Sequence, residues 1–124
     1  EQTPIFSPSV SDFIQGMIVS IPLHFSWFND NMDTEKVQCL MEKFYSGANF
    51  IKVLKKDEGI SDKGYFRPDN LVGTNFLDIS VFGNDDNCQL IISSRLDNLG
   101  KGASGAAIQS MNIALGFDET LGLK

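Results

Sequence analysis

The sequence predicts an α+β domain with a mixed or antiparallel sheet and helices on one face. Three observations lead to this class. One segment alternates almost without a break between apolar and other residues, three strand-like segments follow one another without an intervening helix, and two of these are joined by a short hairpin. The expected order is β, α, β, β, β, α. With 124 residues, the chain has the length of one domain.

The clearest strand spans residues 17–27, whose alternate side chains are apolar. The side chains on this apolar face are Met17, Val19, Ile21, Leu23, Phe25 and Trp27. Because Pro22 has no N–H for a sheet ladder, we expect this strand to lie at an edge or to carry a bulge. An apolar face left open in a monomer predicts association with copies of the same chain, as a dimer or tetramer.

A helix is predicted from about Thr34, capped by Asp33 or Thr34. Its apolar stripe follows the spacing i, i+3, i+4, i+7 and consists of Val37, Leu40, Met41 and Phe44. Cys39 lies beside this stripe, and we expect it in the core. Cys88, at the start of a later strand, is expected to be a small buried side chain.

Further strands are predicted at 49–55, 75–82 and 88–95, with residues 83–87 as the hairpin connection. Residues 56–70 are polar and interrupted by glycine and proline, so they predict a loop. Lys63 or Arg67 in this loop is a weak candidate for attracting a phosphorylated substrate. The last helix is expected at about 102–115, with Gly116 at its end.

Composition excludes several classes of function. The formal net charge of −6 argues against non-specific binding of nucleic acid, which needs a basic surface. No apolar run reaches the roughly 18 residues of a membrane span. Two cysteines are typical of a reduced, cytoplasmic protein. No group of residues has metal-ligand spacing, and His24 is expected to be a surface or interface residue.

The stretch from Asp97 to Asn112, DNLGKGASGAAIQSMN, carries the strongest functional signal. It predicts a helix that opens on small residues, with its first N–H groups free to seat an anion. Lys101 adds a cation beside that seat, so a phosphate-bearing ligand would suit it. The alternative is that the small residues only allow the helix to pack closely on another element.

The chain resembles N-acetyl-γ-glutamyl-phosphate reductases, a family of NADP-dependent enzymes of arginine biosynthesis. The segments that carry this resemblance are DNLGKGASGAAIQSMNIALGFDETLGL from Asp97, VGTNFLDI from Val72, FSPSV from Phe6, and QGM from Gln15. They span nearly the whole chain in the family's order. The resemblance implies a C-terminal domain like that of glyceraldehyde-3-phosphate dehydrogenase over residues 1–124, with its last helix packed on a Rossmann domain that is absent here.

The resemblance also implies site residues. Asn98, Lys101, Gly102, Ala103 and Gly105 would contact NADP. Gln15 and Gly16 would contact the substrate, N-acetyl-γ-glutamyl phosphate, although many members carry arginine where Gln15 stands.

The residues that perform the family's chemistry do not occur in this chain. The family's nucleophilic cysteine lies in a Gly-Cys turn and its histidine in an H-R-H motif, and the neighbours of Cys39, Cys88 and His24 match neither. A G-x-G-x-x-G fingerprint is absent too. We therefore expect an inactive fragment without catalytic residues of its own. Two alternatives remain: a non-catalytic interaction or regulatory module on a dehydrogenase scaffold, and an aspartate-semialdehyde dehydrogenase domain.

Overall fold

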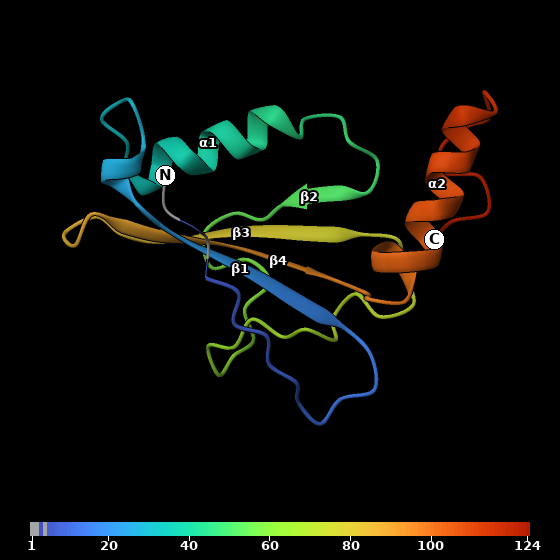
Figure 1. Cartoon of the computed structure of the whole chain (residues 1–124), viewed down its shortest axis with the longest axis horizontal. Coiled ribbons are helices and arrows are strands. Elements are labelled where there is room, and N and C mark those ends of the chain that lie inside the picture. Colours follow the sequence, from blue (N-terminus) through green and yellow to red (C-terminus); the bar gives the residue numbers. More distant parts are fainter. Residues whose placement is uncertain (1–2, 4) are drawn as a thin grey trace.

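The computed structural model describes residue 3 and residues 5–124. Its elements are β1 (Met17–His24), a 3-10 turn (Phe25–Trp27), α1 (Thr34–Phe44), β2 (Ile51–Val53), β3 (Leu77–Asn84), β4 (Gln89–Leu96), a π-helical turn (Gly100–Ser104) and α2 (Gly105–Ala114). This order and the mixed sheet confirm the predicted α+β class. As Figure 1 shows, α1 lies over the sheet, whereas α2 stands beyond one end of it.

The four strands lie in the order β1-β4-β3-β2. β4 is antiparallel to both β1 and β3, and β2 is parallel to β3. β1 therefore forms an edge, which confirms the position that Pro22 predicted. The prediction for 17–27 was too long, because the chain turns after His24 and the Phe25 N–H donates to the Cys88 carbonyl at 2.9 Å.

The other predicted bounds also need small corrections. β2 is shorter than 49–55, since only residues 51–53 pair with β3. β3 and β4 pair as far as Asn84 and Gln89, so the turn occupies residues 85–88 and each strand is shifted from its predicted position. The last helix opens with the π-helical turn at Gly100, two residues early, and ends as predicted at Gly116, where φ is +74°.

One face of the sheet is apolar and only half covered. The register places Val19, Ser94 and Ile79 side by side on this face, and α1 packs there against β2 and β3. Ile79 is buried beneath the helix, but over β1 the side chains of Met17, Val19 and Ile21 remain 37%, 44% and 52% exposed. We call these three residues the open half of the apolar face.

Helix α1 begins as the sequence predicted, because the Asp33 side chain accepts a hydrogen bond from the Lys36 N–H at 2.8 Å. Its predicted stripe is only partly correct. Val37 is buried, whereas Leu40 and Phe44 are 55% and 78% exposed, because the helix reaches across only half of the sheet.

The opposite face of the sheet is polar and lies under the loop at 56–70. Arg95 and Asp78 form a buried ion pair there, with Nε and Nη2 at 2.9 and 2.8 Å from one Asp78 oxygen. The guanidinium also donates to the Gly59 carbonyl and lies over the Phe66 ring. The loop is thus irregular, as predicted, but the buried arginine fixes it to the sheet.

Both cysteines are free and exposed, so their predicted burial was wrong. Cys39 lies two residues after buried Val37, which turns it toward the other side of the helix. Cys88 lies in the hairpin turn with φ of +51°. His24 is exposed, as predicted, with its ring 5.3 Å from that of Trp27.

Two absences hold for the described part of the chain. No helix there is long and apolar enough to cross a membrane, and no group of three or more His, Cys, Asp or Glu residues could hold a metal ion.

Candidate functional site

The structure brings together two segments that we predicted to contribute site residues: Gln15 and Gly16, and the segment that begins at Asp97. The Gln15 side-chain nitrogen donates to both carboxylate oxygens of Asp97, at 2.7 and 2.6 Å. The next N–H, that of Gly16, donates to Asn98 Oδ1 at 2.8 Å. The entrance to β1 is therefore fixed against the exit from β4, at the end of the sheet where α2 begins.

Asp97 is the centre of this contact and is 1% exposed. It also accepts hydrogen bonds from the N–H groups of Gly73 and Leu99, both at 2.8 Å. Burial acts to raise the pKa of Asp97, but the hydrogen bonds from Gln15 and the backbone outweigh it and lower the pKa to about 2. Asp97 therefore stays ionised and ties together three segments of the chain.

Two of the selected glycines are required by close packing. Gly16 has φ of +114°, and a Cβ there would overlap the Pro68 carbonyl. Gly105 is buried, and a Cβ there would overlap the side-chain oxygen of Asn75. Both glycines, with Gln15 and Asn98, therefore anchor the site.

The anion seat expected at the start of the last helix is not free. The Leu99 N–H is bound by the Asp97 carboxylate, and the Gly102 N–H by the Asp97 carbonyl at 2.8 Å. The Ser104 N–H and hydroxyl both donate to the Leu99 carbonyl. The chain's own carboxylate occupies the electropositive position, so a second anion there would meet a like charge.

What remains accessible is a surface with few side-chain atoms. Leu99 is 56% exposed, and Gly102, Ala103 and Ser104 are exposed as well. We call these four residues the shoulder. A flat ligand could approach the backbone closely there, because Gly102 and Ala103 are exposed and carry at most a methyl group themselves.

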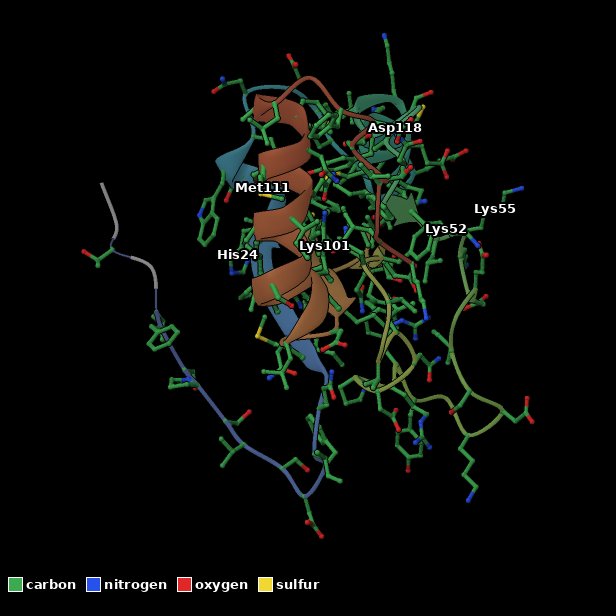
Figure 2. The ribbon with its side chains drawn as sticks, turned by 90° about the vertical axis from the view of Figure 1, so that its right-hand side faces the viewer. His24, Lys52, Lys55, Lys101, Met111 and Asp118 are labelled. Atoms are coloured by element: carbon green, nitrogen blue, oxygen red, sulfur yellow. The ribbon has the colours of Figure 1, made fainter. Side chains whose placement is uncertain are left out.

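Lys101 lies within this turn, but its side chain runs along α2, beside the lower turns of the helix in Figure 2. Its ammonium donates to Gln109 Oε1 at 2.6 Å and lies 5.6 Å from the centre of the Phe50 ring. Burial lowers the pKa of Lys101, and the Glu119 carboxylate acts in the opposite direction.

Sequence reasoning missed three residues that hold the site together. Asp97 stands at the start of the DNLGKGASG segment, yet two of its partners, Gln15 and Gly73, are far away in sequence. Gln109 and Glu119 lie in the same C-terminal run, and Gln109 Nε2 donates to Glu119 Oε2 at 2.9 Å. The loop candidate Arg67 bonds Asp69 in its own loop.

A cavity of about 520 Å³ lies on the polar face of the sheet, and Asn49, which donates to Glu119, contributes to its lining. Lys52, Glu58, Asp78 and Arg95 contribute its charged lining. Because Lys52 pairs with Glu58 and Arg95 with Asp78, the lining offers no unpaired charge of either sign among these four residues.

Comparison with known protein families decides the fold family. The model for "Semialdehyde dehydrogenase, dimerisation domain" matches residues 1–98. The chain belongs to the semialdehyde dehydrogenase dimerisation-domain family. This membership agrees with the resemblance seen in the sequence. The match to the family model ends at residue 98, just before the shoulder.

Three curated relatives are similar to this chain over nearly its whole length. The chain is 46% identical over 123 residues to N-acetyl-gamma-glutamyl-phosphate reductase 2 of Nostoc sp. and 45% identical to N-acetyl-gamma-glutamyl-phosphate reductase of Trichormus variabilis. It is 40% identical over 116 residues to the Brucella ovis protein of the same name. These alignments cover 97%, 97% and 94% of the chain, but 38%, 38% and 37% of the relatives.

Proposed function

We propose that this dimerisation domain is the C-terminal part of a reductase that converts N-acetyl-γ-glutamyl phosphate to N-acetylglutamate semialdehyde in arginine biosynthesis, in the cytoplasm. The observation that carries the proposal is the identity of 40–46% along nearly the whole chain to relatives of that name. The catalytic cysteine and histidine would come from the part of such a reductase that precedes this domain.

NADPH would supply the hydride for this reduction, and the phosphate would leave the acyl carbon as inorganic phosphate. The domain's contribution would be one wall of the pocket, made by the shoulder at Leu99 and Gly102–Ser104. Because Asp97 already occupies the helix start, the shoulder suits an uncharged, flat part of the cofactor better than a phosphate. Gln15, Gly16, Asn98 and Gly105 would act beneath it as anchors that keep the wall in place.

Exposed apolar side chains on α2 suggest where the rest of the polypeptide would pack. Ile108, Met111 and Ile113 are 37%, 52% and 59% exposed on a helix that stands clear of the sheet. We propose that a Rossmann domain packs against this helix and places the nicotinamide near the shoulder. The open half of the apolar face would then serve the contact between subunits in a dimer or tetramer.

The test is an assay of the complete reductase polypeptide, which measures oxidation of NADPH with N-acetyl-γ-glutamyl phosphate. Aspartyl phosphate serves as the competing substrate, since a related dehydrogenase would prefer it. We expect turnover with the first substrate only. Preference for aspartyl phosphate, or no oxidation of NADPH with either substrate, would overturn the assignment.

Two variants then test the wall. Ala103→Leu adds bulk to the shoulder and should raise the KM for NADPH about tenfold, as a misplaced ligand costs on the order of 1–2 kcal/mol. Ser46→Leu, at an exposed position in the turn after α1, is the control. Lys101→Ala should also weaken use of NADPH, whereas Lys43→Ala on α1 should not.

A further inference from the structure

Lys101 stands between two glycines in the π-helical turn, so the backbone around it has little intrinsic rigidity. Gly100 and Gly102 allow many backbone conformations, and the shoulder that they carry is exposed. Hydrogen bonds from Gly102 and Ser104 hold the turn on the side of Asp97 and Leu99, so a further anchor is needed only on the side of α2. The only side chain longer than that of leucine within Gly100–Ser104 is that of Lys101.

The Lys101 ammonium is held by a chain of polar contacts that ends in the segment after α2. Gln109 Oε1 accepts from Lys101 at 2.6 Å and from Asn75 Nδ2 at 3.3 Å. The donor end of the same amide reaches Glu119 Oε2 at 2.9 Å. The other Glu119 oxygen accepts from Asn49, just before β2. Each partner fixes the orientation of the Gln109 amide, with its oxygen toward Lys101.

The C-terminal segment 117–124 is itself held in place. Asn112 is buried, and its side chain donates to the carbonyls of Glu119 and Leu121 at 3.3 and 2.9 Å. The Asn75 N–H donates to the Lys124 carbonyl at 2.5 Å. Glu119 is therefore a fixed point, and the contact chain transmits its position to the turn.

We propose that Gln109 and Glu119 are positioning residues, which hold Lys101 through hydrogen bonds and thereby fix the shoulder that would contact the cofactor. The identity of the ligand in this inference rests on the proposed function. The contact chain, which is the set of hydrogen bonds linking Lys101, Gln109 and Glu119, does not depend on it. The segment after α2 would thus support the site through Lys101.

An exchange of the two side chains tests the proposal in the complete polypeptide. Gln109→Glu keeps an oxygen that can accept from Lys101. It removes the N–H that donates to Glu119 and places a second carboxylate against that residue. It should raise the KM for NADPH at least about fivefold, within the range of coupling between contacting residues, and leave kcat within about twofold. Adding Glu119→Gln restores a donor opposite the new carboxylate, so the double variant should return KM to within about twofold of the parent.

The matched control is Gln38→Glu on α1, where Gln38 Nε2 donates to Glu42 at 2.8 Å far from the site. It should leave KM unchanged. Unchanged KM in Gln109→Glu, or a double variant no better than the single one, would overturn the inference.

Hydrogen exchange separates the two proposals. The amides of Gly100–Ser104 should lose protection in Gln109→Glu and regain it in the double variant. If the parent protein does not oxidise NADPH but exchange follows this pattern, the contact chain stands and the proposed function fails. If activity is present and exchange does not change, the positioning role fails alone.

Discussion

Gln15 and Asp97 are 82 residues apart in the chain, and one amide nitrogen of the glutamine lies within 2.7 Å of both oxygens of the aspartate. This contact closes the end of the sheet from which α2 departs. Because Asp97 is buried and accepts further backbone hydrogen bonds, the pair has a larger effect on stability than a surface contact of the same length.

Acid should therefore destabilise the protein through Asp97. Its pKa falls from 3.8 to about 2 on folding, so its stabilisation of about 2 kcal/mol is present above pH 4 and is lost as the pH falls toward 2. Asp97→Asn should lower the free energy of unfolding at pH 7 and flatten its dependence on pH between 4 and 2. Urea titrations across this range measure both effects. Asp62→Asn, in the exposed loop, is the control, and an equal loss in that variant would contradict the assignment.

Replacement of Gln15 tests whether its main task is to anchor Asp97. Gln15→Arg retains donors and adds a charge opposite the carboxylate, so the melting temperature should stay the same or rise. Gln15→Leu removes the donor and should cost about 1–2 kcal/mol, because Asp97 loses a hydrogen bond to a charged group. Equal stability of the leucine variant and the parent in thermal melts would show that the contact contributes nothing.

A methyl group at position 105 should disturb the packing of α2 on residue 75. Gly105→Ala places a Cβ against the Asn75 side chain, and we expect a loss of about 2 kcal/mol from this overpacking. In the Asn75→Ala background the closest contact is removed and only the Gly100 carbonyl remains near, at 3.0 Å, so the same change should cost less. A double-mutant cycle measured by denaturant unfolding gives the coupling. Additive effects would mean that α2 moves away freely.

The open half of the apolar face predicts how copies of the chain associate. Ile21→Glu places a charge in the middle of this patch, and we expect the sedimentation coefficient to fall toward that of a monomer. The control is Gln89→Glu, an exposed position on the polar face of the same sheet. Dissociation by the control, with an intact assembly in Ile21→Glu, would assign the interface to the polar face instead.

Local patterns predicted those features that depend on neighbouring residues. Pro22 indicated an edge strand because it lacks a donor, and Gly116 indicated a helix end because the chain adopts a positive φ there. The alternation from Met17 to Leu23 correctly predicted which side chains share the apolar face. It could not show that the strand ends before Phe25. Its N–H bonds Cys88, a contact that no local pattern contains.

The site was predicted in its location but not in its electrostatics. Small residues after Asp97 indicated that another group lies close to this backbone. The structure shows that at Gly105 this group is the Asn75 side chain. A helix start rich in N–H groups attracts any anion. The sequence could not show that the anion is the carboxylate of Asp97. The Gln109–Glu119 contact was hidden because amides on a helix surface and carboxylates in a turn are ordinarily solvated.

The pairing of β1 with β4 also affects how the protein folds during synthesis. Met17 lies opposite Leu96, so the first strand leaves the ribosome long before its only neighbour in the described sheet. The β3–β4 hairpin, closed by four residues, can form soon after it emerges, whereas β1 must wait with its apolar side chains in water. We expect this strand to be the segment that a ribosome-associated chaperone covers in the nascent chain.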